Sequence, residues 1–271
     1  MDEQLKADCE SCFGLCCVAL PYAASADFPI DKPGGIPCHH LKEDYRCGIH
    51  QNLREKQFRG CAVYECFGAG QKVSSVTYGG KSWREDTALM EEMFAVFPVM
   101  QQLHEILNYV AEAMQRREAE PLYLDLQRVF RKIEELTFLP PKDLLAADVE
   151  ALRAEANLSL IKTSQLVRGK GRQTKRRYEG LGAKLKGAAL NGTDYRGALL
   201  IAADLRDADL RKIDWIGADI RDADLRGANL SGSIFLTQAQ VNSAKGDVNT
   251  KLPEHLQKPD HWKNKVKNHT R

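Results

Sequence analysis

The sequence predicts a multidomain α+β protein in which a small loop-rich cysteine domain, a helical segment and a repetitive coil follow one another. All eight cysteines lie near the N-terminus, amphipathic patterns recur in the middle of the chain, and units of five residues repeat near the C-terminus. A chain of 271 residues has room for two or three small domains. We expect domains at 1–80, 81–167 and 181–241, with a basic linker at 168–180 and a C-terminal cap and tail at 242–271.

The cysteines of the first domain predict a metal site. In a reducing compartment, thiols clustered in this way favour metal binding over disulfides. Two thiolates separated by two residues, as at Cys9 and Cys12, can curl round one ion, and a turn through Gly14 can add a third. A core this small usually needs a metal or another staple. The predicted ligands are Cys9, Cys12, Cys16, Cys17, Cys38, Cys47, Cys61 and Cys66.

The identity of the cofactor stays open between zinc and an iron–sulfur cluster. The four later cysteines can complete a second tetrahedral set or close a single cluster. Disulfides, a thiol relay and buried free cysteines are the alternatives. Possible substitute ligands are His39, His40 and His50.

The cysteine block is similar to a known family. It has an early CxxC motif, a CC pair at 16–17, and later cysteines that include the run Cys-Gly-Ile-His at 47–50. In these features, residues 9–71 resemble the zinc- or iron-chelating cysteine-cluster family, and the resemblance implies metal chelation. The triplet Cys-Phe-Gly occurs at 12–14 and again at 66–68, which predicts similar tight turns at the two ends of the block.

Three amphipathic helices are expected in the middle of the chain, because apolar residues recur there at helical spacing. Pro98 is expected to begin or kink the first helix, Pro121 to open the second, and Pro140 with Pro141 to separate the second from the third. We interpret the apolar stripes as the core of a bundle. They are Leu103, Leu107, Val110 and Met114, then Leu122, Leu126, Val129 and Ile133, then Leu145, Val149, Leu152 and Ala156.

The segment 168–177 has six basic residues, no acidic residue and two glycines. This composition is typical of a solvated linker. Clustered Lys and Arg can also bind nucleic acid through its phosphates. Aromatic residues for stacking on bases are scarce nearby, so we favour the linker.

Eleven consecutive units of five residues run from residue 183 to residue 237. Each unit has one large apolar residue at its centre and a small residue, mostly alanine, two positions earlier. Apolar residues would recur near 3.6 in a helix and near 2 in a simple strand. A period of five therefore predicts a coil that turns a corner in every unit and encloses both residues.

The unit pattern A(D/N)LXX, as in the ADLRD of residues 203–207, resembles the bacterial pentapeptide-repeat family. The resemblance implies a right-handed quadrilateral parallel β-helix with four units per coil. Residues twenty apart then stack, which places Tyr195, Trp215 and Phe235 in one interior column. Residues 236–262 look like the terminal cap of such proteins, which covers the last edge of the coil.

The predicted function is that of a noncatalytic binding or scaffold protein, with a metal-stabilised N-terminal module and a repeat domain that binds a protein partner. The alternative is an iron–sulfur or iron-dependent redox or modifying enzyme whose repeats recruit its substrate. No catalytic residue is predicted, because hydrolase, kinase, dehydrogenase and HExxH patterns are absent from the sequence. The best-known activity of pentapeptide-repeat proteins is protection of topoisomerases by an acidic rod, whereas the repeats here hold eight basic and eight Asp residues.

The charge and hydropathy of the chain point to a cytoplasmic location. The net charge is +2, and neither a basic-then-apolar leader nor a run of about 18 apolar residues is present. We therefore expect no membrane contact.

Overall fold

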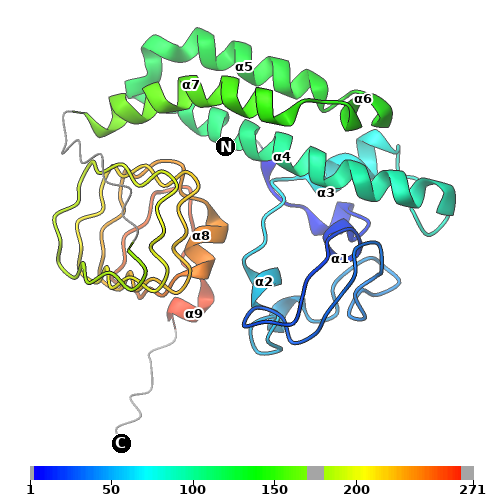
Figure 1. Ribbon diagram of the computed structural model, residues 1–271, viewed down its shortest axis with the longest axis horizontal. Coiled ribbons are helices and arrows are strands. Elements are labelled where there is room, and N and C mark those ends of the chain that lie inside the picture. The colour runs from blue at the N-terminus through cyan, green and yellow to red at the C-terminus, as the bar shows by residue number, and fades with distance from the viewer. Residues whose placement is uncertain (1–2, 170–179, 264–271) are drawn as a thin grey trace, which may run out of the picture. The chain divides into compact units, whose positions relative to one another are not determined.

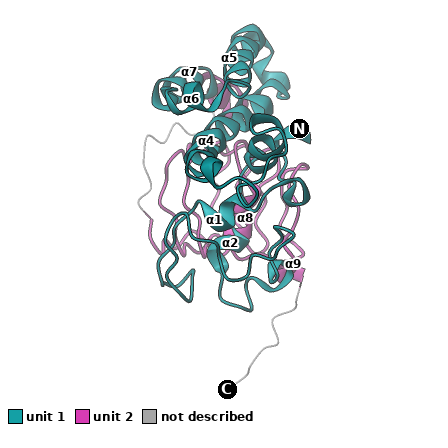
Figure 2. Ribbon diagram, turned by 90° about the vertical axis from the view of Figure 1, so that its right-hand side faces the viewer, with its two compact units in different colours: residues 1–161 teal, residues 162–271 magenta. Residues whose placement is uncertain are grey.

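The structure is a computed structural model that describes residues 3–169 and 180–263. The chain divides into two compact units, residues 1–161 and residues 162–271, which Figure 2 shows in different colours. Most of the predicted linker at 168–180 lies outside the described residues. Within the described part, no helix combines the length and apolar composition needed to cross a bilayer.

The described helices and helical turns are short, apart from three. In chain order they are η1 (Glu3–Leu5), η2 (Cys9–Ser11), α1 (Leu15–Val18), η3 (His50–Asn52), α2 (Arg59–Ala62), α3 (Ala69–Gln71), the π-helical turn η4 (Lys72–Thr77), η5 (Thr87–Leu89), α4 (Met90–Met114), η6 (Arg117–Leu122), α5 (Tyr123–Leu136), α6 (Pro141–Leu145), α7 (Val149–Arg168), α8 (Gln238–Ser243) and α9 (Asp260–Lys263).

Loops dominate the chain before α4. Its described β-pairing there is limited to isolated antiparallel bridges, Tyr22 with Lys32 and Leu41 with Cys47. Prolines and glycines between residues 29 and 37 interrupt any longer helix. The loops therefore depend on contacts between side chains, and on the neighbouring helix α4, for their conformation.

Helix α4 is the centre of the first unit and contacts α3, α5 and α6 (Figure 1). Its apolar residues recur every three or four positions, and Phe97 and Leu103 are fully buried. The three predicted apolar stripes fall largely in α4, α5 and α7. Pro98 lies inside α4 rather than at its start, whereas Pro141 occupies the first position of α6, where a missing N–H is harmless.

The predicted parallel β-helix is wrong. In the described residues of the second unit no β-strand forms, and the described part of the chain is mostly helix and loop rather than α+β. The repeats instead form successive turns, joined by isolated parallel bridges between residues twenty apart, such as Lys184 with Asp204 and Asp204 with Asp224. We call residues 180–237 the repeat stack.

Turn geometry explains why strands do not form. A left-handed residue recurs every five positions in the repeat stack, and its φ is +64° at Gly197, +67° at Gly217 and +53° at Lys212. The residues beside each corner belong to the turn. Only about one residue per unit therefore remains to pair with the next coil. Glycine takes this conformation without strain, whereas a lysine does so at a cost.

The interior of the repeat stack contains the residues that the period predicts. The central apolar residues from Tyr195 to Phe235 are buried, as are the alanines two positions before them. The rings of Tyr195 and Trp215 lie 5.4 Å apart between centroids, at an angle of 55°. Residues twenty apart therefore do stack, although they do so through turns rather than strands.

The far end of the repeat stack is covered by the chain that follows it. Thr237 caps α8 through a reciprocal pair of hydrogen bonds with Gln240. The Gln240 amide also donates to the backbone oxygens of Trp215 and Ala218, at 2.9 and 2.8 Å. Because Lys245 and Lys251 then form parallel bridges with the last units, the final edge is paired.

Candidate metal centre and repeat surface

The two Cys-Phe-Gly triplets each place their glycine in the left-handed region, although Phe67 also has a positive φ and Phe13 does not. The φ angle is +68° at Gly14 and +80° at Gly68. In each turn, backbone N–H groups donate to the cysteine sulfur: those of Leu15 and Gly14 to Cys12, and those of Gly70, Gly68 and Cys66 itself to Cys66.

Such hydrogen bonds favour the thiolate, which is the form that binds metal. Burial works against them and raises the pKa of both the Cys12 and Cys66 thiols. The two turns therefore present sulfurs that are partly stabilised as anions but need a further positive charge to ionise fully.

The N-terminal segment is held against the second turn by hydrogen bonds from residues far along the chain. The Gln71 side chain accepts from the Asp8 N–H at 3.0 Å and donates to the Lys6 carbonyl at 2.6 Å. The Phe13 N–H donates to the Ser74 hydroxyl at 3.0 Å. These contacts bring Cys9 and Cys12 close to Cys66.

The electrostatic neighbours of Cys9 agree with this proximity. Its thiol pKa is raised to about 11 by burial and then by the charges of Cys66, Cys12 and Cys17. Cys16 also lies among these thiols, because Cys12 and Cys66 act on its pKa. We call Cys9, Cys12, Cys16 and Cys66 the first cysteine group.

The other four cysteines gather around a different set of loops. The Cys38 N–H donates to the Cys17 carbonyl at 2.9 Å. Leu41, which is three residues after Cys38, forms a β-bridge with Cys47. Burial raises the Cys61 thiol pKa to about 12, aided by the charges of Cys17, Cys38 and Cys47. We call Cys17, Cys38, Cys47 and Cys61 the second cysteine group.

Cys16 and Cys17 connect the two groups. They are consecutive residues of α1, and their thiols share a hydrogen bond that raises the pKa of Cys16 and lowers that of Cys17. Ionisation of Cys17 is therefore favoured over that of Cys16.

A buried lysine lies beside the second cysteine group. Lys32 is 5% exposed, and its ammonium donates to three backbone carbonyls, those of Val18 at 3.1 Å and of Pro33 and Ile36 at 2.9 Å. Its electrostatic neighbours are Cys38, Cys17, Cys16 and Cys61. The three carbonyls fix a positive charge in place among these thiols.

The three histidines that sequence reasoning offered as substitute ligands have other surroundings. The rings of His39 and His40 lie 3.8 Å apart between centroids, and both contact the ring of Phe58. His50 is the first residue of the turn η3.

The thiols are neighbours without forming a completed ligand shell. In the ranges 3–169 and 180–263, no three Cys, His, Asp or Glu side chains are close enough together to hold an ion as they stand. The electrostatic interactions between the thiols nevertheless distinguish two neighbourhoods, and Cys17 interacts with members of both. Cys66 interacts with the early cysteines, which are 50 to 57 positions away in sequence, and Cys17 interacts with the later ones, which are 21 to 44 positions away.

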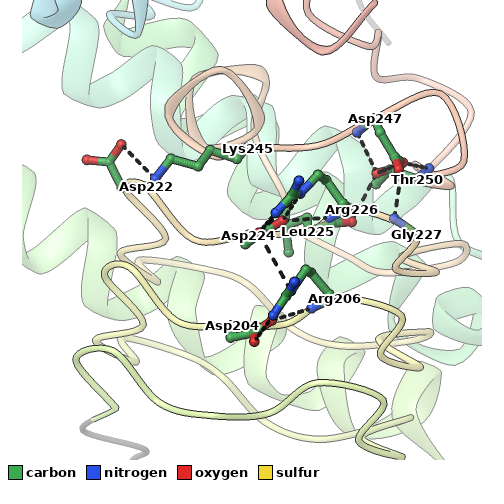
Figure 3. A network of polar contacts seen from close by, with 10 residues as sticks. All are labelled: Asp204, Arg206, Asp222, Asp224, Leu225, Arg226, Gly227, Lys245, Asp247 and Thr250. Atoms are coloured by element: carbon green, nitrogen blue, oxygen red, sulfur yellow. Dashed lines mark hydrogen bonds and ion pairs between the residues drawn. The ribbon is translucent and has the colours of Figure 1, made fainter. Parts of the chain in front are cut away.

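The surface of the repeat stack carries fixed pairs of opposite charges. Asp204 accepts from the backbone N–H of Arg206 and binds its guanidinium at 2.8 and 2.6 Å. Asp224 and Arg226 repeat this arrangement one coil later, and Arg206 reaches Asp224 at 3.8 Å (Figure 3). The aspartate of the repeat therefore fixes its own turn and also orients the arginine.

One charged residue of the repeat stack is buried. Asp214 is fully buried and pairs with Arg196 at 2.9 Å. Its pKa is raised by burial, against the lowering effect of Arg196 and of a hydrogen bond from Ser164. Arg168, at the end of α7, pairs with Asp194 at 3.1 Å. The last turn of α7 is thus attached to the repeat turns within the second unit.

An apolar patch interrupts the charged surface. Leu199 is 48% exposed, and Ile201, two positions later, is partly exposed. The bridge from Leu199 to Asp219 places the Asp219–Arg221 pair on the next coil beside this patch. The surface of the repeat stack therefore combines an exposed apolar side chain with an oriented ion pair.

Comparison with known proteins identifies the repeats. The family model for pentapeptide repeats matches residues 182–214 and 198–235, with eight copies. A Bacillus subtilis (strain 168) protein, described as uncharacterized protein YybG, is 59% identical over 265 residues, which cover 96% of this chain and 95% of that protein. Nothing in these comparisons supports the resemblance of residues 9–71 to the cysteine-cluster family.

Proposed function

We propose that this chain, which belongs to the same protein family as YybG and carries pentapeptide repeats, is a noncatalytic scaffold. In this proposal it binds a protein partner through its repeat stack. The observation that carries the proposal is the ordered outer surface of the stack. Its arginines are held by aspartates two positions earlier, so their side chains lose little entropy when a partner binds. Its interior is filled by side chains and leaves the surface as the part available for recognition.

The patch of Leu199 and Ile201 is the proposed centre of the interface. Interfaces place apolar residues at the centre and polar groups around them, and oriented arginines contribute strongly to binding. The nearby Asp219–Arg221 pair supplies such a polar rim. With both charge signs present, the surface favours a protein partner over a nucleic acid, which would require a field of one sign.

Quantitative affinity capture from cells of the source organism is used to identify the partner. The affinity of the full chain for the purified partner is then measured. Leu199→Glu introduces a charge into the patch and is expected to weaken binding by at least tenfold. Val248→Glu is the matched control, because Val248 is also an exposed apolar residue, at 65%, but lies in the cap. Equal binding by both variants and the unchanged chain would contradict the proposed interface.

The cysteine region is proposed to be a structural metal module, with zinc as the ion. Loops without long helices bury little apolar surface by themselves, and metal ligation would add folding free energy directly. Support comes from the grouping of the thiols and from the N–H groups directed at Cys12 and Cys66. In this proposal zinc holds the loops in position and does no chemistry.

Zinc content of the purified full chain tests this module. Bound zinc that resists dialysis is expected, together with increased exchange of backbone amides in residues 3–80 after chelation. Protein that carries no metal, and whose amide exchange ignores chelators, would exclude a metal module.

A further inference from the structure

We propose that the eight cysteines form two separate four-thiolate zinc sites, the first from Cys9, Cys12, Cys16 and Cys66 and the second from Cys17, Cys38, Cys47 and Cys61. The inference rests on the metal module proposed above, and adds the membership, number and charge environment of the sites. Four thiolates and no other ligand complete the tetrahedral shell that structural zinc prefers.

The two Cys-Phe-Gly turns favour the first site. Their sulfurs accept backbone N–H groups, which favour the thiolate against the burial that raises both thiol pKa values. The backbone also leaves room for the metal ligands at this point. A Cβ atom on Gly70 would lie 2.7 Å from the Cys12 sulfur, so a side chain there would displace the thiol.

The short helix α1 allows one cysteine to serve each site. Consecutive residues of a helix point about 100° apart around its axis, as follows from 3.6 residues per turn. Cys16 can therefore turn toward Cys12 and Cys66 while Cys17 turns toward the second group. Binding of the two ions would replace the hydrogen bond that the two thiols share, and would release the thiol protons.

Lys32 supplies a counter-charge for the second site. A divalent ion with four thiolates has a net charge of about −2, which is costly to bury without a nearby cation. All three ammonium protons of Lys32 are directed at the carbonyls of Val18, Pro33 and Ile36, so the lysine is positioned beside the thiols without being a ligand. Its side chain is a positioning residue that stabilises the loaded site.

Metal stoichiometry in paired variants tests the membership. With zinc alone as the probe, the unchanged full chain is expected to bind two ions, and Cys12→Ser or Cys61→Ser one each. The double variant C12S/C66S should still bind one ion, because both residues belong to the first site. The matched double variant C12S/C61S should bind none.

The opposite pattern, with no ion in C12S/C66S and one in C12S/C61S, would overturn the membership. One ion per unchanged chain would overturn the two-site inference but leave the metal module intact. Absence of zinc from the unchanged chain would refute the module itself, so the two failures can be told apart.

A second measurement uses the unchanged chain and does not depend on variants that fold. During slow zinc removal by a chelator, cysteines are alkylated and identified by mass spectrometry. The four members of a group are expected to become reactive together, at a rate that differs between groups. Labelling in which Cys66 follows Cys38 and Cys61 rather than Cys9 and Cys12 would refute the grouping.

The role of Lys32 has its own readout. Lys32→Met is expected to weaken zinc binding at the second site about tenfold, in the range typical of groups that support metal ligands. The first site of the same chain is the internal control and should keep its affinity. Lys32→Arg should restore part of the loss, and equal weakening of both sites would show that Lys32 acts only through the fold.

Discussion

Removal of the indole ring of Trp215 is the sharpest test of how the repeat stack is held together. Trp215 is fully buried and contacts Tyr195 one coil earlier. A buried tryptophan removes roughly 150–250 Å² from water, which at about 25 cal/mol per Å² corresponds to about 4–6 kcal/mol. Measured Trp→Ala costs in protein cores are about 3–5 kcal/mol, so we expect Trp215→Ala to cost about 4 kcal/mol.

Hydrogen exchange followed by mass spectrometry of the full chain measures this loss locally. Each 1.4 kcal/mol is about a factor of ten in an opening equilibrium, so amides of the repeat stack should lose about a thousandfold in protection. Peptides from α4 and α5 in the first unit are the internal reference.

Trp215→Phe is the matched control. In the described part of the chain, the Trp215 ring nitrogen has no hydrogen-bond partner. Replacing it by phenylalanine removes this unpaired buried donor, and that gain offsets part of the stability lost with the smaller ring. We expect a cost of about 1 kcal/mol. If Trp215→Ala left protection in the repeat stack unchanged, our account of its core would be refuted.

Three further predictions concern the turns, the charges and the metal. Lys212→Gly should stabilise the repeat stack by up to about 1 kcal/mol in thermal unfolding, because φ is +53° at this residue, and Gly217→Ala should destabilise it by a similar amount. Hydrogen bonds from Arg206 lower the pKa of Asp204 to about 2. Those from Arg211 lower the pKa of Asp209 below the usual 3.8. Because these pKa values are lower in the folded than in the unfolded state, the carboxylates stabilise the fold above pH about 4, and this stabilisation is lost toward pH 2. The unfolding temperature should therefore fall between about pH 4 and pH 2. The fall should be smaller in 1 M salt, which screens the ion pairs. Chelation should increase amide exchange in residues 3–80 and leave that of the repeat stack unchanged, and equal effects in both regions would contradict a local metal module.

The interior of the repeat stack could be predicted from sequence, but its secondary structure could not. A period of five identifies the residues that face inward, and Leu205, Trp215 and Leu225 are all fully buried. Whether the residues between two corners form a strand depends on how many residues take part in the turns at those corners. Because left-handed residues occur as often as every fifth position, only isolated bridges form.

The candidate metal site shows the same division between local and distant information. The repeated Cys-Phe-Gly triplet correctly predicted two turns with a left-handed glycine, since this conformation is a local property, but the turns differ at Phe13 and Phe67. Which thiols are neighbours depends on contacts such as that of Phe13 with Ser74, between residues 61 positions apart. The buried position of Lys32 had no sequence signal, because isolated lysines are usually exposed.

The charge pairs of the repeat surface were also missed. Sequence reasoning counted equal numbers of basic and acidic residues but did not connect an aspartate with the arginine two positions later. The signal was present in units such as ADLRD, where Asp204 fixes a turn through the Arg206 N–H and thereby places the arginine beside it.

The content of zinc, iron and acid-labile sulfide, measured on protein purified without oxygen together with its visible absorption spectrum, tests the central claim most directly. The account predicts two zinc ions per chain, no sulfide and no colour. A brown protein with iron and sulfide would contradict a purely structural module, and protein without any metal would contradict both cysteine sites.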